Sequence, residues 1–172
     1  MTCEIELSQG LVALVDDEDY EELNQWKWHA ARNGTGDSGF YAVRRISRKG
    51  KRTRIFMARE IMNAKVGEQV DHKDGKATLN NQKSNLRICT NAQNQRNRGP
   101  QKNNASGYKG VYPYKKGKWR AKIQVDKLDI HLGIFDVVTE AALAYNKAAL
   151  LHHREFAYQN EVPTCASEMV VV

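Results

Sequence analysis

The sequence is poor in cysteine, with three residues spread widely at Cys3, Cys89 and Cys165. No C-x-x-C pair occurs, so neither a zinc ribbon nor a disulfide framework is indicated. Cys89 directly follows Ile88 and is expected to be buried as a small hydrophobic side chain. This cysteine usage fits a reducing compartment, and we expect the protein in the cytoplasm.

Long apolar runs are also missing, and the first residues include no basic segment. We therefore expect neither a secretion signal nor a membrane span, and no membrane partner. Hydrophobic residues make up 41% of the chain and charged residues 27%, which is typical of a globular protein and not of a disordered one. The length of 172 residues allows one ordinary domain or two small ones.

Acidic residues are scarce in one part of the chain. Residues 71–125 contain thirteen Lys and Arg against two Asp and Glu, whereas residues 1–70 contain eleven of each kind. The net charge of +7 therefore has its main source in residues 71–125, which indicates a polyanionic partner for that stretch. The alternative is a solvated basic face that serves only solubility, and the aromatic residues interleaved with the basic ones argue against it.

Short strands and turns dominate the first 60 residues. Three strands are predicted there, at 26–30, 40–46 and 53–57. A Gly-rich turn at 33–39 separates the first two, and the acidic residues 16–19 offer N-caps for a short helix that ends near Leu23. We expect these elements to form a small sheet that supports the segment after it.

One segment gathers the residue types of a hydrolytic metal site. Asp71 and His72 are adjacent, and Asn85 and Asn94 follow them. Carboxylate and amide oxygens suit Mg²⁺ or Mn²⁺, and an imidazole with a reference pKa of about 6.5 is largely neutral at physiological pH. A simpler interpretation stays open, because asparagines are common in turns. A calcium-binding EF-hand loop is excluded, since Gln82 stands at the twelfth position from Asp71.

These residues form the pattern D-H…L-N-N…N-L-R…T…Q-N-x-x-N, preceded by V-D-D-E-D-Y. The pattern resembles that of the HNH endonucleases over roughly residues 10–98. The resemblance implies a ββα-metal (His-Me finger) fold, in which two antiparallel strands and a helix grip one divalent ion. The first strand would end at 70–72, the second would span 86–89, and the helix would span 91–97.

The same resemblance implies roles for individual residues. His72 matches the general base, and Asn85 matches the residue that holds the loop and orients His72. Asp71 and Asn94 match the metal ligands, and the amide at Asn94, where histidine is frequent in the family, favours Mg²⁺ or Mn²⁺. Asn97 and Arg98 lie three and four residues after Asn94, so they share its helix face and are expected to contact the scissile phosphate.

The pattern changes after a polar joint with Gly and Pro at 99–107. Residues 118–125 alternate strictly between polar and apolar side chains, which predicts a strand with one polar face and one packed face. A strand at 129–134 and an Ala-rich amphipathic helix at 139–152 follow. The tail from 161 onward lacks periodicity and is predicted to be disordered.

The motifs S-G-Y-K-G-V, G-K-W-R-A-K-I, H-L-G-I-F-D and T-E-A-A-L-A-Y-N-K-A-A are similar to those of the plant Apetala-two/ethylene-response-factor DNA-binding domain. The resemblance covers residues 107–159 and implies a three-stranded antiparallel sheet in the major groove, with a helix packed behind it. Residues at the positions of the family's base and phosphate contacts are Lys109, Tyr112, Tyr114, Lys116, Lys122, Gln124 and His131. Lys118 and Arg120 are expected to hold phosphates.

Together these patterns predict an α+β protein with two domains. The predicted parts are a ββα-metal nuclease domain at 1–98, a linker at 99–107, a sheet-plus-helix DNA-binding domain at 108–160 and a tail at 161–172. The predicted function is that of a metal-dependent, site-preferring endonuclease of the phage homing type, which acts on double-stranded DNA in the host cytoplasm as a monomer or weak dimer. The alternatives are a non-catalytic, sequence-specific DNA-binding regulator and an RNA nuclease.

Overall fold

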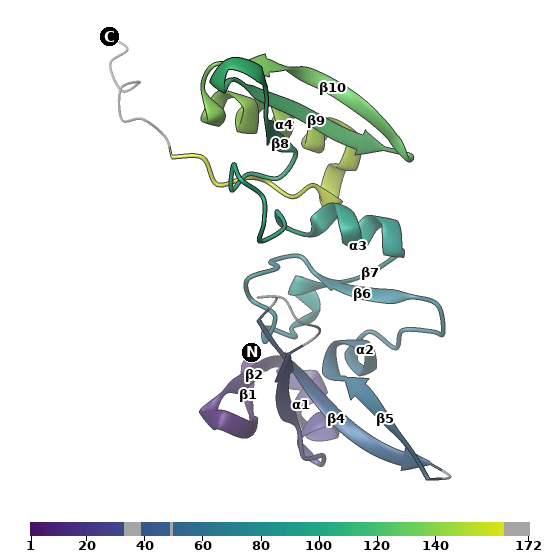
Figure 1. Cartoon of the computed structure of the whole chain (residues 1–172). Coiled ribbons are helices and arrows are strands. Elements are labelled where there is room, and N and C mark those ends of the chain that lie inside the picture. Colours follow the sequence, from purple (N-terminus) through teal and green to yellow (C-terminus); the bar gives the residue numbers. More distant parts are fainter. Residues whose placement is uncertain (33–38, 49, 164–172) are drawn as a thin grey trace. The chain divides into compact units, whose positions relative to one another are not determined.

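The computed structural model describes residues 1–32, 39–48 and 50–163. The chain divides into two compact units, Met1–Gln95 and Arg96–Val172, and each unit has its own apolar core (Figure 1). Most of the predicted Gly-rich turn and the tail beyond residue 163 lie outside the described residues. Helices and small antiparallel sheets occur in both units, which agrees with the α+β prediction.

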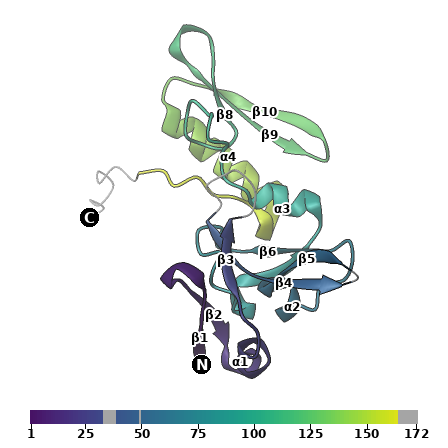
Figure 2. The ribbon, with the colours of Figure 1, turned by 60° about the horizontal axis from the view of Figure 1, so that its bottom comes forward.

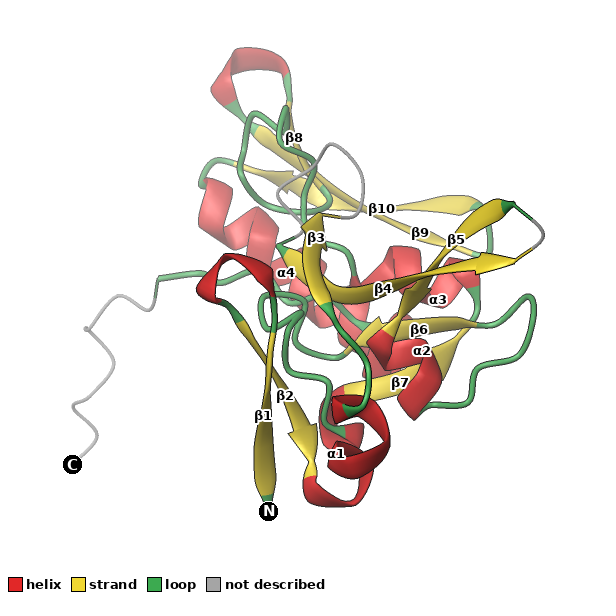
Figure 3. Ribbon diagram, turned by 90° about the horizontal axis from the view of Figure 1, so that it is seen from below, coloured by secondary structure: helices red, strands yellow, loops and turns green. Residues whose placement is uncertain are grey.

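The first unit contains seven described strands and the helices between them (Figure 3). Its elements are β1 (Thr2–Glu6), β2 (Val12–Asp16), α1 (Asp17–Asn24), β3 (His29–Arg32), β4 (Phe40–Arg48), β5 (Lys51–Phe56), α2 (Met57–Ile61), β6 (Gln69–His72), β7 (Leu86–Cys89) and α3 (Asn91–Asn97), whose last two residues belong to the second unit. The strands pair antiparallel in three sheets, β1–β2, β3–β4–β5 and β6–β7. The prediction contained no counterpart of β1.

The strand predicted at 26–30 begins later, at His29. Trp28 is the reason, because its indole is almost fully buried and its Nε1 donates a hydrogen bond to the carbonyl of Leu23 at the end of α1 (2.8 Å). This bond makes residues 25–28 a connection that anchors α1 to the core. Trp26 remains exposed, with the Arg44 guanidinium 4.3 Å from its ring centre.

The predicted helix after the acidic run is present as α1, but its start differs from the expectation. Asp16 occupies the N-cap position without a capping hydrogen bond from its side chain. Its carboxylate instead accepts hydrogen bonds from the Gln82 side chain (3.0 Å) and from the backbone N–H of Lys83 (2.8 Å). The carboxylate therefore fastens the β6–β7 connection to the first sheet.

A second set of bonds fixes the same connection on β2. Leu14 N–H donates to the carbonyl of Leu79 (2.9 Å), and Asn81 N–H donates to the carbonyl of Leu14 (2.7 Å). The long connection between β6 and β7 is thus held by backbone pairing and not only by its own turns. This places the end of β6 at a defined position in the first unit.

The second unit contains a three-stranded antiparallel sheet with a helix on one face (Figure 2). Its elements are β8 (Val111–Pro113), β9 (Trp119–Val125), β10 (Leu128–Phe135) and α4 (Val138–His153). Small side chains on α4, such as Ala141 and Ala149, are fully buried and allow the helix to approach the sheet closely. The predicted strands at 118–125 and 129–134 and the predicted helix at 139–152 are confirmed within one or two residues. Among the described residues, no helix is both long enough and apolar enough to cross a membrane.

Candidate functional site

The strand–strand–helix order predicted for the first site is present. β6 pairs antiparallel with β7, with Asp71 opposite Arg87 and His72 opposite Leu86. Helix α3 follows β7 directly, and Thr90 starts it with a reciprocal capping box. Thr90 N–H donates to Gln93 Oε1 (2.8 Å), and Gln93 N–H donates to Thr90 Oγ1 (3.3 Å).

Asp71, the predicted metal ligand, is engaged by an arginine. Its Oδ2 accepts hydrogen bonds from Nε (2.9 Å) and Nη2 (2.7 Å) of Arg87. Both side chains are about nine-tenths buried, so the pair lies in a low-dielectric setting. The N-L-R motif contained this arginine, but the prediction assigned it no role.

Asn94, the second predicted ligand, lies on the same side of β6 as Asp71. Its Nδ2 donates to Oε1 of Gln69 (2.6 Å), and Gln69 is two residues from Asp71 on the strand. Because strand residues two apart share a face, α3 covers the face that holds both Gln69 and Asp71. The fold therefore brings the two predicted ligands to one face, although each has a protein partner there.

His72, the predicted general base, contacts a different set of groups. Its Nε2 lies 3.3 Å from Oδ1 of Asn81, and its ring packs edge-on against Tyr41 with centroids 5.8 Å apart. Burial lowers the pKa of His72 below its usual value, against smaller opposing effects of Asn81 and Asp71. The imidazole is therefore neutral at neutral pH.

The hydrogen bonds of Asn81 also indicate which tautomer His72 adopts. Asn81 Nδ2 donates to the carbonyl of Leu79 (3.1 Å), so the atom that faces the imidazole is the acceptor Oδ1. His72 Nε2 must then donate its proton, which leaves the basic lone pair on Nδ1. Neither Asn81 nor Tyr41 was predicted as a site residue.

Asn85 holds the connection between the two strands. Its Oδ1 accepts from Asp74 N–H (3.0 Å), and its Nδ2 donates to the carbonyls of Asn80 (2.9 Å) and Ala77 (3.3 Å). Its own carbonyl accepts from Lys73 N–H (2.8 Å). Asn85 therefore fits both interpretations of the sequence, because it stabilises the turns of the connection and also holds this loop in place.

The donors fit a hard cation by type, because Asp71 and Asn94 both supply oxygens. Within the described residues, however, no group of three or more His, Cys, Asp or Glu side chains is placed to hold a metal ion. Arg87 already binds Oδ2 of Asp71, so a divalent ion at this carboxylate would lie beside a guanidinium cation that competes with it. The requirement for Mg²⁺ or Mn²⁺ stays a prediction, as do the phosphate contacts of Asn97 and Arg98, which belong to the second unit.

The second unit presents a polar sheet face opposite the helix. Antiparallel partners point to the same side of a sheet, and the register pairs Tyr112 with Arg120 and Lys122 with His131. Gln124 lies two residues beyond Lys122 on the same face, whereas Ala121 and Ile123 are buried on the other. We call the first side the outer face, with members Tyr112, Arg120, Lys122, Gln124, Asp129 and His131.

Aromatic rings and carboxylates orient the cations near this face. The Lys122 ammonium lies 5.3 Å from the Tyr112 ring centre and 2.6 Å from an Asp129 oxygen. The Arg120 guanidinium lies 6.0 Å from the Tyr114 ring centre. Lys118 forms an exposed pair with Asp136 (2.8 Å), and Lys116 is exposed in the turn before β9.

Lys109 differs from the other predicted contacts, because its ammonium donates to the backbone carbonyls of Arg96 (2.6 Å) and Arg98. Burial, with a smaller effect of Arg98, lowers its pKa to about 8. The side chain of Asn160 binds the backbone of Lys109 through two hydrogen bonds. It accepts one from the Lys109 N–H (2.7 Å) and donates the other to the Lys109 carbonyl (3.1 Å). Lys109 thus joins the two ends of the unit, and no sequence signal had marked Asn160 as its partner.

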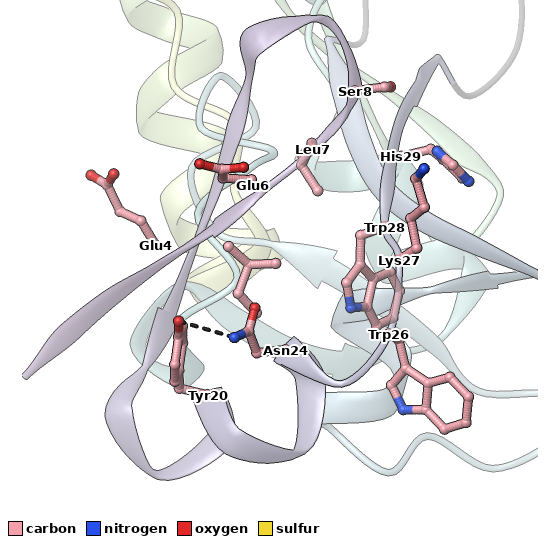
Figure 4. Close-up of a pocket in the computed structure, with 11 residues that line it drawn as sticks. Glu4, Glu6, Leu7, Ser8, Tyr20, Asn24, Trp26, Lys27, Trp28 and His29 are labelled. Carbon is pink, nitrogen blue, oxygen red and sulfur yellow. Dashed lines mark hydrogen bonds between the residues drawn. The ribbon is translucent and has the colours of Figure 1, made fainter.

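A pocket of about 460 Å³ lies elsewhere in the first unit, between β1, α1 and the segment that leads into β3 (Figure 4). Glu4 and Glu6 line one side, and the exposed indole of Trp26 lines the other. Tyr20 and Asn24 also line the pocket, and Asn24 Nδ2 donates a hydrogen bond to the Tyr20 hydroxyl (3.1 Å). The pocket contains none of the predicted site residues.

A 47-residue stretch of the chain is 51% identical to an ethylene-responsive transcription factor-like protein of Arabidopsis thaliana. The match covers 27% of this chain and 20% of that protein, so the chain corresponds to a fifth of its relative's length. No protein-family profile matches the chain. No solved structure matches it either.

Proposed function

We propose that the protein binds double-stranded DNA through the outer face of β8–β9–β10. The observation that carries the proposal is the alignment of Tyr112 with Arg120 and of Lys122 with His131 on the side of the sheet that α4 leaves open. Cations on such a face can hold phosphates, and amide, imidazole and phenol groups can reach base edges. The similarity of 47 residues to a transcription factor-like protein supports this partner.

The ion pairs on the outer face and beside it do not oppose the proposal. Lys122–Asp129 and Lys118–Asp136 are solvent-exposed pairs, and such pairs stabilise a protein by at most about 1 kcal/mol. A phosphate can therefore replace either carboxylate at little cost. The outer face then contains both positioning and base-reading groups.

Replacing Lys122 with glutamine is expected to weaken DNA binding. If Lys122 contacts a phosphate, Lys122→Gln lowers the slope of log K against log salt by about 0.9 and weakens binding to all sequences to a similar extent. Fluorescence anisotropy of labelled duplexes over a salt series measures both quantities. Lys147→Gln on the exposed side of α4 is the matched control and should leave the slope unchanged. Equal slopes for the two variants would contradict the proposed face.

We also propose, as a second candidate activity, that the β6–β7–α3 segment hydrolyses DNA phosphodiester bonds. It is supported by the position of His72 at the end of β6, where burial lowers the pKa of the imidazole, and by the hydrogen bonds with which Asn85 holds the adjacent loop. His72 would take a proton from the attacking water, and a bound divalent ion would neutralise charge on the scissile phosphate. The Asp71–Arg87 pair and the burial of both Asp71 and His72 weigh against it, so DNA binding is placed first.

Supercoiled plasmid incubated with Mg²⁺ or Mn²⁺ tests the second candidate. Catalysis predicts nicked circles, with a rate that falls about 10²–10⁴-fold in His72→Ala, since general-base assistance has that size. His29→Ala, in the same unit but outside the site, should cut like the wild type. Plasmid that stays intact with either metal would leave a non-catalytic DNA-binding protein, and faster cleavage of structured RNA than of DNA would change the substrate class.

A further inference from the structure

The first unit separates its charges sharply, although their totals balance. Residues 1–26 contain eight Asp and Glu and no Lys or Arg. Residues 40–59 contain eight Lys and Arg and no Asp or Glu. Most of the basic stretch belongs to the two strands β4 and β5.

The register of β4 and β5 gathers three arginines on one face of this hairpin. Arg45 lies directly opposite Arg54, and Ser47 lies directly opposite Arg52. All four side chains are exposed. The hairpin itself extends beyond α2 (Figure 1). Residues two apart on a strand are separated by about 6.8 Å, so the guanidinium groups form a compact cationic face.

Among the described residues, no carboxylate pairs with these three arginines. The carboxylate nearest in sequence, Glu60, pairs with Arg44 on the opposite face of β4. Like charges directly opposite each other destabilise an antiparallel pair, so the Arg45–Arg54 pairing has a cost that an external anion would remove.

We propose that the β4–β5 hairpin is a second DNA-binding surface, which contacts the phosphodiester backbone through Arg45, Arg52 and Arg54. Guanidinium groups bind phosphates in a bidentate manner, and a two-stranded ribbon fits a major groove about 12 Å wide. The choice of DNA as the polyanion rests on the proposed function of the second unit. The hairpin itself gives the first unit a DNA contact that is independent of the β6–β7–α3 segment.

The salt dependence of binding by the full chain tests this surface. Arg45→Gln/Arg54→Gln removes two phosphate contacts and should lower the slope of log K against log salt by about 1.8. The control Lys27→Gln/Lys65→Gln removes the same charge from exposed sites in the same unit and should leave the slope unchanged. Arg45→Lys/Arg54→Lys keeps the charge and should also keep most of the slope. Thermal unfolding should show the glutamine variant at least as stable as the wild type, because the like-charge pairing is gone.

Three results would overturn the proposal. The first is an equal loss of slope in the hairpin and control variants, and the second is an equal loss in the lysine and glutamine variants of the hairpin. The third is a wild-type chain that binds no duplex DNA, which removes the proposed function as well. If Lys122→Gln weakens binding while Arg45→Gln/Arg54→Gln does not, only the hairpin surface is refuted and the outer face of the second unit stands.

Discussion

Gly110→Ala is expected to destabilise the second unit by about 2–6 kcal/mol. Gly110 adopts a φ of +77°, and a Cβ there would overlap the ring of Tyr145 and lie 2.7 Å from the backbone oxygen of Lys122. Tyr145 is buried in the core, and the Lys122 carbonyl belongs to β9, so neither can move aside easily. Overpacking costs about 1–3 kcal/mol, and a left-handed backbone on a non-glycine residue costs about 1–3 kcal/mol more.

Gly117→Ala separates the two causes. Gly117 has a similar φ of +74°, but no described atom outside its chain neighbours lies within 4 Å of the position that an alanine methyl would take. This variant should therefore lose only the backbone contribution, about 1–3 kcal/mol. Hydrogen–deuterium exchange, read peptide by peptide, should show lost protection in β9 and α4 for Gly110→Ala and much less for Gly117→Ala. Equal loss in both variants would show that the close approach of Gly110 to Tyr145 contributes nothing.

Asp71→Asn is expected to destabilise the first unit by about 3–5 kcal/mol, because it breaks the buried ion pair between Asp71 and the Arg87 guanidinium. An arginine cannot escape this cost by losing its proton, because a guanidinium stays protonated in proteins. Urea titrations, in which hydrogen–deuterium exchange of β6 and β7 reports the unfolding of the first unit, measure the effect. Glu18→Gln, which breaks an exposed pair with Lys83, should cost less than about 1 kcal/mol.

The double variant Asp71→Leu/Arg87→Leu tests the same pair from the other direction. Replacing a buried ion pair by apolar side chains is often neutral or stabilising, so this variant should recover most of the stability that Asp71→Asn loses. If Asp71→Asn behaved like the wild type, the Asp71–Arg87 pair would not be a stable feature of the fold. Asp71 would then be available to a metal ion, which would strengthen the nuclease proposal.

The elements with a clear period or spacing could be predicted from the sequence. The alternation in β9 and the helix α4 follow from local pattern, because each element buries one face against its neighbour. The order of β6, β7 and α3 followed from a motif resemblance and not from periodicity. β1 was missed, since its pairing with β2 depends on a contact that no local pattern shows.

The sequence indicated candidate residues for the first site but not the partners that they contact in the fold. The sequence placed Asp71 beside His72, but only the β6–β7 register brings Arg87 opposite Asp71. The environment of His72 depends on Tyr41 and Asn81, which come from a different sheet and from the connecting loop. These contacts join residues from separate elements of the fold, and the spacing of residues along the sequence does not predict them.

Counts of charged residues along the sequence also miss how the fold groups these residues. Averaging over residues 1–70 gave a balanced total, and this average concealed the acidic start and the basic hairpin. Strand register then decided which arginines share a face, as it did for Arg45 and Arg54. In the second unit, the positive charge of Lys109 was counted toward DNA, although its ammonium is held by backbone carbonyls.

Lysine reactivity with and without duplex DNA tests the central claim most directly. Mild acetylation of the full chain, read by mass spectrometry, reports how accessible each ammonium is. If the outer face binds DNA, saturating duplex should slow the reaction of Lys122 on that face and of Lys118 just before β9, and leave that of Lys147 on α4 unchanged. Unchanged reactivity of Lys118 and Lys122 in the DNA-bound protein, or equal protection of Lys147, would contradict the account.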